Sequence, residues 1–185
     1  MRVYELSGFE VFLILFTLAV GVSIAWSTLR VGISPMPSSK SARQAIIRLT
    51  EETGAGTIID LGCGWGNLVI PLALKFPHRQ IVGYELSIMP WLTAVILKKI
   101  LRLKNLTLYR QDFLKSDWSG AEVIVCYLYP GGMDSIKNKI ESEESDIRFV
   151  VSNNFALPSH QPDKTVRLND FYNSPVYLYQ LKSTR

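Results

Sequence analysis

The segment DLGCGWGN at residues 60–67 decides how this chain folds. It directly follows the apolar run TII at 57–59, so it predicts a buried β-strand that ends in an acid and passes through alternating glycines into a helix. Glycine lets the backbone turn sharply and lets a ligand lie against the main chain. Glu85 closes the next apolar run, IVGY at 81–84, and supplies a second carboxylate. Because open α/β sheets bind ligands at the carboxyl ends of their strands, both acids are candidate ligand-binding residues.

The spacing of the glycines narrows the class of ligand. A dinucleotide-binding turn has the order G-x-G-x-x-G, whereas this loop has G-x-G-x-G after an acid, which suits a positively charged nucleoside better than a phosphate. The pattern D-x-G-x-G-x-G resembles motif I of the class I S-adenosylmethionine (SAM) methyltransferases, and Glu85 resembles their ribose-binding acid. A dinucleotide site or a purely structural turn are the alternatives. The residues expected to bind the cofactor are Asp60, Gly62, Cys63, Gly64, Gly66, Asn67, Glu85, Leu86, Asp112 and Phe113.

Length and composition predict one globular domain with an appendage. The chain has 185 residues and a net charge of +4, and its cations form no continuous tract, so we expect no nucleic-acid partner. Cys63 and Cys126 have apolar neighbours at predicted strand ends, which favours buried, reduced thiols. His78 and His160 are far apart and no C-x-x-C pair occurs, so we predict no metal site.

The N-terminal segment differs from the rest of the chain. Val11–Leu29 contains no charged residue, and nineteen residues rising ~1.5 Å each span roughly 28 Å, about the thickness of a membrane's hydrocarbon core. Trp26 suits an interfacial position near the end of the segment. We therefore predict a transmembrane anchor at residues 1–33 and a methyltransferase domain at 34–185. A cleaved signal peptide and a buried core helix are the alternatives.

The charges that flank this segment predict its orientation. Before it, Arg2 is the only basic side chain and is offset by two acids. After it come Arg30, Lys40, Arg43 and Arg48. Because basic residues are enriched on the cytoplasmic side of a membrane, we expect the C-terminal domain to face the cytoplasm.

The rest of the chain alternates predicted strands and helices, which is typical of a mostly parallel sheet with helices on both faces. The strands are expected at 57–61, 80–85, 106–109, 122–127, 148–152, 165–168 and 175–181, and the helices at about 40–52, 67–75, 90–103 and 134–142. Ser38 or Ser39 would cap the first of these helices. Only a loop fits between Asp112 and Glu122, so one crossover helix is missing or reduced to a turn.

The helix at 90–103 is expected to bury one side and expose the other. Its aliphatic residues, predicted to be buried, are Leu92, Val95, Ile96, Ile100 and Leu103. Three cations lie on the opposite side: Lys98, Lys99 and Arg102. We interpret these cations as a solvated face, with a lipid or substrate patch as the alternative.

Two strand ends carry candidate catalytic residues. Tyr127, Tyr129 and Pro130 precede two glycines and predict an irregular turn, whose carbonyl groups and tyrosine hydroxyls could orient an amine. Asn153 and Asn154 follow the next strand and precede an aromatic residue, which favours a substrate-facing role. At each place an ordinary structural turn is the alternative. Asp112 could likewise be an ordinary loop acid rather than an acceptor for the adenine amino group beside Phe113.

The order of motifs along the chain resembles one family. PMPSS at 35–39, the glycine loop, GYEL at 83–86 with PWL at 90–92, and DFL at 112–114 follow one another, and further matches are VIV at 123–125, Pro130, Met133, Phe155, Pro158 and Pro162. With the N-terminal apolar segment, they resemble the membrane-anchored ATP synthase c-subunit lysine N-methyltransferases. The resemblance implies an α/β, Rossmann-like class I methyltransferase fold with a seven-stranded sheet, SAM as methyl donor, a protein lysine as acceptor, and residues 35–38 as part of a lid.

We therefore expect a membrane-anchored, SAM-dependent methyltransferase that acts on a lysine of a membrane-associated protein. A methyltransferase for a small or lipid-like molecule is one alternative, because only the acceptor site would differ. A SAM-binding protein without catalysis is another, because Trp65 and Asn67 stand where the family carries an acid and an arginine.

Overall fold

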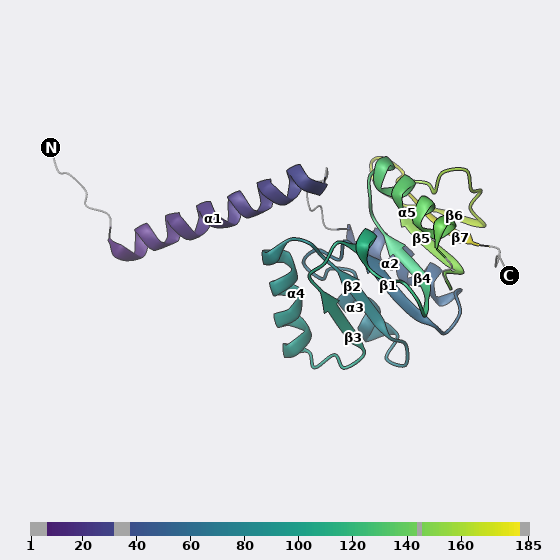
Figure 1. The fold of residues 1–185 in the computed structure, drawn as a ribbon, viewed down its shortest axis with the longest axis horizontal. Helices are drawn as coiled ribbons and strands as arrows, with labels where there is room; N and C mark the ends of the chain where they lie inside the picture. The colour runs from purple at the N-terminus through teal and green to yellow at the C-terminus, as the bar shows by residue number, and fades with distance from the viewer. Residues whose placement is uncertain (1–6, 32–37, 144–145, 182–185) are drawn as a thin grey trace.

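Seven strands form one sheet at the centre of the molecule (Figure 1). The structure is a computed structural model that describes residues 7–31, 38–143 and 146–181, with the backbone alone described for 23–31. The strands are β1 Thr57–Leu61, β2 Ile81–Tyr84, β3 Leu106–Tyr109, β4 Ala121–Cys126, β5 Phe149–Asn153, β6 Lys164–Arg167 and β7 Pro175–Gln180. They lie side by side in the order β3-β2-β1-β4-β5-β7-β6.

The strands run parallel except at one edge of the sheet. β1 pairs in parallel with β2 and β4, and the same holds for β2 with β3 and for β4 with β5. Only β7 is antiparallel, to both β5 and β6. The chain therefore reverses its direction of progress across the sheet between β1 and β4, which is where open α/β sheets bind ligands. The predicted mostly parallel sheet is confirmed, and each strand ends within one residue of its predicted bounds.

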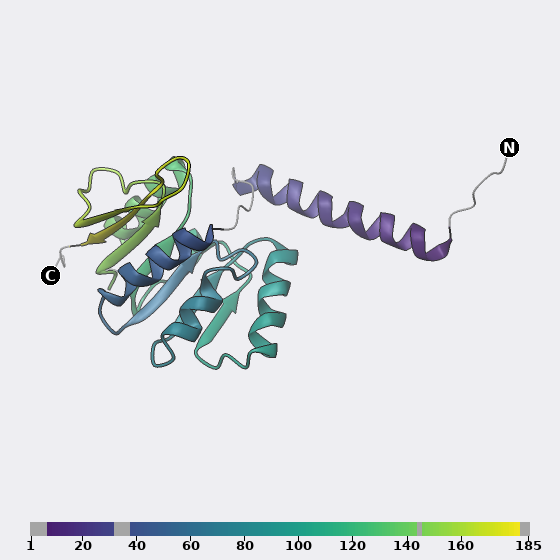
Figure 2. The ribbon, with the colours of Figure 1, turned by 180° about the vertical axis from the view of Figure 1, so that it is seen from behind.

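Helices cover both faces of the sheet (Figures 1 and 2). They are α1 Gly8–Val31, α2 Lys40–Glu51, α3 Val69–Lys75, α4 Ile88–Ile100 and α5 Pro130–Ser142, with a 3₁₀ turn, η1, at Phe113–Lys115. Alternate strand residues point to opposite faces. Ile58 and Val123 pack with buried residues of α2 and α3, whereas Ile59 and Ile124 pack with those of α5. The sheet is thus the middle layer between two hydrophobic clusters.

Two connections have the predicted form. The Ser39 hydroxyl accepts a hydrogen bond from the N–H of Ala42 at 3.1 Å and caps α2, so it satisfies one of the free donors at the start of that helix. Between β3 and β4 the only helical element is η1, which confirms that a crossover helix is reduced to a turn. In place of a helix, this connection buries Trp118 in the hydrophobic cluster on the α5 side of the sheet.

Helix α5 begins at Pro130, whereas the predicted helix begins at Asp134. The predicted irregular turn at Pro130 and its two glycines is therefore wrong. Proline fits the first position of a helix because no hydrogen bond requires its missing N–H there. Pro130 thus starts the helix after a connection of three residues, 127–129, that follows β4.

The prediction of a buried aliphatic stripe on α4 is wrong for three of its residues, whereas Leu103, just after the helix, is buried as predicted. The residues that α4 buries are Pro90 and Ala94. By contrast, Leu92, Ile96 and Ile100 are 41%, 49% and 68% exposed. The physical reason is the position of the helix, because α4 packs against β3, the edge strand of the sheet. The described elements therefore leave the outer side of α4 largely exposed.

Helix α1 projects away from the sheet and contacts α4 (Figure 1). Its described side chains include the exposed Phe9, Phe12 and Leu15. Within the part of the chain that the structure describes, no helix is long and apolar enough to cross a membrane, so the predicted transmembrane helix is not supported. The predicted segment continues past residue 22 to Trp26 and Leu29, and the side chains of 23–31 lie outside the described residues. Residues 35–37 of the lid predicted at 35–38 also lie outside them.

Candidate functional site

The candidate site lies at the edge of the sheet where the parallel strands end. Leu61 of β1 lies beside Tyr84 of β2 on one side and beside Cys126 of β4 on the other. Cys126 in turn pairs with Ser152 of β5. The structure therefore brings together the residues that follow β1, β2, β4 and β5, which are far apart in the sequence.

The glycine loop after β1 is fastened to the end of β2. The N–H groups of Gly62 and Cys63 both donate to the carbonyl oxygen of Tyr84, at 3.0 and 2.9 Å. Gly62, Gly64 and Gly66 have φ angles of 81°, 53° and 86°, which only glycine adopts without steric cost. The alternating glycines of the sequence are thus required by the backbone path.

The loop leaves open space on one side. A side chain at Gly64 would meet no atom nearer than 4.0 Å, whereas one at Gly66 would meet Ile70 Cδ1 at 2.8 Å and Ala94 Cβ at 3.2 Å. Gly66 therefore packs tightly between α3 and α4, while Gly64 borders room for a ligand. Asn67 is exposed just beyond the loop, and the Cys63 side chain is buried beneath it.

Asp60 is a buried carboxylate at the base of this loop. Its side chain is 3% exposed, and Oδ2 has no hydrogen-bond partner in the described part of the chain. Burial, together with the nearby negative charge of Glu85, raises the pKa of Asp60 to about 7. A cationic ligand beside Asp60 would stabilise the ionised form and so lower this pKa again. Among the residues described, no cluster of His, Cys, Asp or Glu could hold a metal ion in that role.

Glu85 connects the glycine loop to the segment that leads into α4. Its Oε2 accepts a hydrogen bond from the N–H of Gly64 at 3.0 Å, and its Oε1 accepts one from the N–H of Ser87 at 2.7 Å. The side chain is half-buried, and Leu86 beside it is 40% exposed. Because each carboxylate oxygen has a second lone pair, Glu85 can still accept hydrogen bonds from a ligand.

Asp112 and Phe113 follow β3, next to the end of β2. The Oδ1 of Asp112 accepts a hydrogen bond from the N–H of Leu114 at 3.0 Å and caps η1. Phe113 is half-buried, and its carbonyl oxygen accepts a hydrogen bond from Nε1 of Trp118 at 3.1 Å. Both residues thus reach the expected edge of the sheet, and Asp112 has a local capping role there.

The ends of β4 and β5 are joined by an aromatic pair. The rings of Tyr127 and Phe155 stack with their centroids 6.2 Å apart. Asn153 is 5% exposed, and its Oδ1 has no hydrogen-bond partner among the described residues. A buried carbonyl oxygen without a partner is costly, so it marks a position where a donor is expected.

The remaining predicted catalytic residues surround this pair. Asn154 has a positive φ of 69°, and its N–H donates to the carbonyl oxygen of Pro175 at 2.8 Å. Tyr129 is 40% exposed and occupies the position just before α5, where Pro130 follows it. The predicted residues from β4 and β5 therefore meet at one edge, but Asn154 uses its main chain to fix the turn.

A second aromatic pair at this edge is not among the predicted site residues. Phe171 and Tyr172, in the turn between β6 and β7, are 93% and 83% exposed, with ring centroids 5.2 Å apart in an edge-to-face arrangement. The turn lies at the site because β7 is antiparallel to β5, so that Val176 pairs with Asn153. In the sequence, this pair could have been recognised as two adjacent aromatic residues inside the polar run NDFYNS at 169–174.

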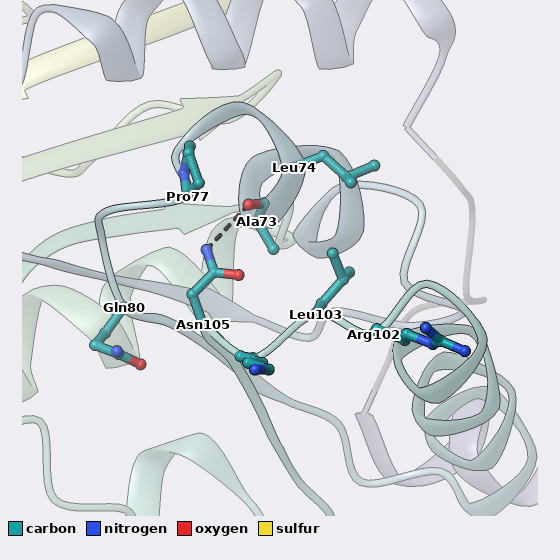
Figure 3. A pocket seen from close by; sticks show the side chains of 8 residues that line it. Ala73, Leu74, Pro77, Gln80, Arg102, Leu103 and Asn105 are labelled. Carbon is teal, nitrogen blue, oxygen red and sulfur yellow. Dashed lines mark hydrogen bonds between the residues drawn. The ribbon is translucent and has the colours of Figure 1, made fainter.

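A pocket of about 470 Å³ opens at the opposite edge of the sheet (Figure 3). It lies between the end of α3 and the connection from α4 to β3, and its lining includes Leu74, Arg102 and Asn105. The Asn105 amide donates to the carbonyl oxygen of Ala73 at 3.0 Å, so it satisfies a free backbone acceptor in the last turn of α3. The lining contains no carboxylate or imidazole, so we do not assign methyl transfer to this pocket.

The model of the ANTKMT methyltransferase domain matches residues 60–164, which is more than half of the chain and begins at Asp60. The chain belongs to this methyltransferase family. The predicted class I methyltransferase is therefore confirmed, and the matched part of the methyltransferase domain contains the glycine loop, Glu85 and Asn153.

Comparison with known proteins agrees with this membership. The methyltransferase domain is similar to a protein-lysine N-methyltransferase of Saccharolobus islandicus, with 25% identity over 146 residues that cover 78% of this chain and 91% of the relative. It is also similar to the adenine nucleotide translocase lysine N-methyltransferase of Mus musculus, with 29% identity over 110 residues. That match covers 58% of this chain, which spans about half (47%) of the mouse relative.

Solved structures share the fold of the methyltransferase domain. An RNA methyltransferase from Salinibacter ruber, in complex with S-adenosyl-L-homocysteine, aligns with a TM-score of 0.70 and 23% identity over 81% of this chain and 96% of that one. A putative methyltransferase from Escherichia coli aligns with a TM-score of 0.61 and 14% identity over 80% and 88% of the two chains. At these identities the likeness shows the fold alone.

Proposed function

We propose that this chain is a SAM-dependent protein-lysine N-methyltransferase. The observation that carries the proposal is the family match over residues 60–164, because it contains the residues that the fold gathers at one edge of the sheet. The names of the relatives from Saccharolobus islandicus and Mus musculus, both lysine N-methyltransferases, support a lysine side chain as the acceptor.

The site has the features that a SAM molecule requires. When bound, SAM supplies an electrophilic methyl group on a positively charged sulfonium. The unpartnered Oδ2 of Asp60 is proposed to stabilise the positive charge of the cofactor. The open side of Gly64 gives the nucleoside access to the main chain of residues 62–67, with Cys63 and Asn67 contributing through the backbone.

Residues from the next two strands are proposed to hold the nucleoside. Glu85 would accept hydrogen bonds from the ribose hydroxyls through the lone pairs that Gly64 and Ser87 leave free. Leu86 would pack beside it, because its side chain is partly exposed there. Asp112 is proposed to accept from the adenine amino group and Phe113 to pack against the ring.

We place the acceptor lysine between the ends of β4 and β5. An amine attacks only in its neutral form, with its lone pair directed at the methyl carbon. The buried Oδ1 of Asn153 is free to accept an N–H of that amine and so to orient it. The Tyr127 ring, stacked on Phe155, would form one wall of a proposed channel for the acceptor lysine, and the exposed Tyr129 and Pro130 its mouth. Asn154 would hold the channel's shape through its bond to Pro175.

Calorimetry of the full-length chain with SAM tests the cofactor site. We expect Asp60→Ala and Glu85→Ala to lose binding, and Glu141→Gln on the exposed surface of α5 to bind as the wild type does. If the wild type does not bind SAM, the proposed function is rejected. If both site variants bind normally, the residue assignment is rejected.

Labelled methyl transfer tests the acceptor. Membranes and soluble protein are incubated with the chain and methyl-labelled SAM, and the label is followed into protein bands and lipid extract. We expect a labelled protein band that disappears when its acceptor lysine is replaced by arginine. Label in the lipid extract alone would reject the lysine acceptor in favour of a lipid-like substrate.

We also propose that residues 1–33 attach the methyltransferase domain, residues 34–185, to a membrane, with the domain facing the cytoplasm and the acceptor on a membrane-associated protein. The described side chains of α1, up to residue 22, support attachment because they are largely apolar and exposed, and Glu10 is the only charged one among them. The four basic residues between 30 and 48 support the orientation. Release of the full-length chain from membranes by carbonate washing without detergent would contradict the attachment.

A further inference from the structure

Helix α4 presents an aliphatic stripe that the described elements leave largely exposed. Ile88, Leu92, Ile96 and Ile100 are 52%, 41%, 49% and 68% exposed. They recur every fourth residue and therefore lie along one side of the helix, away from the buried Ala94. Scattered exposed aliphatic residues are ordinary, but a continuous stripe of this kind marks a surface that binds another apolar surface.

The charged residues beside this stripe all carry the same sign. Between residues 88 and 105 the chain has four cations, Lys98, Lys99, Arg102 and Lys104, and no acid. Lys99, Arg102 and Lys104 are exposed and Lys98 is half-buried. In the described part of the chain, none of the four forms an ion pair. An apolar stripe flanked only by cations is complementary to an anionic lipid surface.

The stripe lies on a helix that contacts α1. Helix α4 is the outermost helix on the side of the domain from which α1 projects, and the two helices are in contact (Figures 1 and 2). The described side chains of α1 include the exposed Phe9, Phe12 and Phe16. An α1 that enters a lipid layer on this side would bring the outer side of α4 against the same layer.

We propose that α4 lies along an anionic membrane surface, with Ile88, Leu92, Ile96 and Ile100 turned into the headgroup region and the cations at residues 98–104 among the lipid phosphates. The orientation rests on the proposed attachment of α1. The inner side of α4 touches the glycine loop, because Ala94 Cβ lies 3.2 Å from the position of a Cβ at Gly66. Docking of α4 therefore holds the proposed SAM site next to the bilayer.

A site-specific fluorophore tests this contact in the full-length chain. An environment-sensitive dye is placed at Ile96→Cys, and a matched dye at Asn138→Cys on the exposed surface of α5. The native thiols Cys63 and Cys126 are 6% and 0% exposed, so they compete little for the label. With vesicles that contain phosphatidylglycerol, we expect a blue shift and quenching by nitroxide-labelled lipid at residue 96 and neither at residue 138.

Substitutions separate the contribution of the apolar stripe to vesicle binding from that of the cations. We expect Ile96→Ser/Ile100→Ser to weaken binding to phosphatidylglycerol vesicles about tenfold, because it removes two apolar side chains from the contact. Lys98→Gln/Lys99→Gln is expected to weaken binding to these vesicles but not to neutral phosphatidylcholine vesicles. Phe171→Ser/Tyr172→Ser removes comparable exposed apolar groups from the turn between β6 and β7, at the other end of the strand order from β3 and α4, and is expected to bind as the wild type does.

Three outcomes would overturn the proposal in distinguishable ways. If the chain floats with vesicles while the dye at residue 96 stays in water, α1 binds membranes and α4 does not. If the serine variant instead abolishes a concentration-dependent dimer and leaves vesicle binding unchanged, the stripe binds a second copy of the chain. If the chain does not float with vesicles, the attachment of α1 fails as well, whereas the proposed methyl transfer is tested separately by SAM binding.

Discussion

Asp60 and Glu85 stand at the ends of adjacent parallel strands, and the Glu85 charge adds to burial in raising the pKa of Asp60 to about 7. The two acids differ in their contacts. Glu85 accepts hydrogen bonds from two N–H groups, whereas Oδ2 of Asp60 has no partner among the described residues. Near neutral pH, Asp60 therefore changes protonation readily, and a cationic ligand would favour its ionised form.

Asp60 is expected to make stability fall as the pH rises. In the folded chain without ligand it keeps its proton up to pH about 7, whereas its ordinary pKa is 3.8. Between these values the folded state binds more protons than the unfolded state, so the free energy of unfolding decreases with rising pH and levels off above about pH 7. Urea denaturation at about pH 5 and about pH 8 should show a loss of a few kcal/mol in the wild type that Asp60→Asn lacks. Equal pH dependence in both proteins would contradict the raised pKa.

Binding of SAM is expected to release a proton from Asp60 below pH 7. The positive charge of the ligand lowers the pKa of the neighbouring carboxyl group, so the acid ionises on binding. Calorimetry in two buffers of different ionisation enthalpy should give different apparent binding enthalpies for the wild type at about pH 6.5 and equal ones for Asp60→Asn. S-adenosylhomocysteine lacks the sulfonium charge and should release fewer protons. The same proton count for both ligands would place the sulfonium away from Asp60.

Glu85→Gln is expected to weaken SAM binding about 10- to 100-fold, because hydrogen bonds to a charged carboxylate contribute about 1.5–3 kcal/mol. The variant retains one oxygen for either Gly64 of the loop or Ser87 before α4, so one of the two backbone hydrogen bonds to this side chain is lost. Calorimetry measures the loss, and Glu141→Gln serves as the control for removal of an exposed acid. Unchanged affinity would show that Glu85 only orders the loop.

Gly66→Ala is expected to destabilise the fold by about 2–3 kcal/mol, from the cost of a positive φ and from overpacking. The new Cβ would lie 2.8 Å from Ile70 Cδ1 at a φ of 86°. Gly120→Ala is the matched control, because its φ is 73° and a Cβ there would meet nothing within 4 Å. Urea denaturation should therefore show a smaller loss for Gly120→Ala, of about 1–2 kcal/mol. Equal losses would mean that α3 and α4 shift to accommodate the methyl group.

Asn153→Ala is expected to lower kcat for lysine methylation about 10- to 100-fold while leaving the Kd for SAM unchanged, because the amide would orient the acceptor rather than hold the donor. Asn138→Ala, an exposed amide on α5, is the control. Single-turnover methylation measures the rate, and calorimetry measures the affinity for SAM. Loss of SAM binding in parallel with the rate would place Asn153 in the cofactor site instead.

Local patterns were sufficient for most of the fold. The apolar runs before residues 60 and 85, and the run that follows Glu122 in the strand expected at 122–127, predict buried parallel strands because a strand covered on both faces leaves no position for alternating polar residues. Ser39 predicts the start of α2 because its hydroxyl can replace a missing backbone acceptor. The start of α5 could not be placed in this way, since proline followed by two glycines fits both a turn and the first turn of a helix.

The sequence by itself determined the individual strands, the glycine loop, both acids and the class of ligand. Each of these depends on residues that are adjacent in the chain. Only the tertiary structure decided which buried polar side chains lack a hydrogen-bond partner among the described residues and which apolar side chains are exposed to solvent. Asp60 has a raised pKa because neighbouring strands bury it beside Glu85. Ile96 and Ile100 are exposed because α4 packs on the edge strand β3. A helix at the edge of the sheet has protein on one side only, whatever the pattern of its apolar residues.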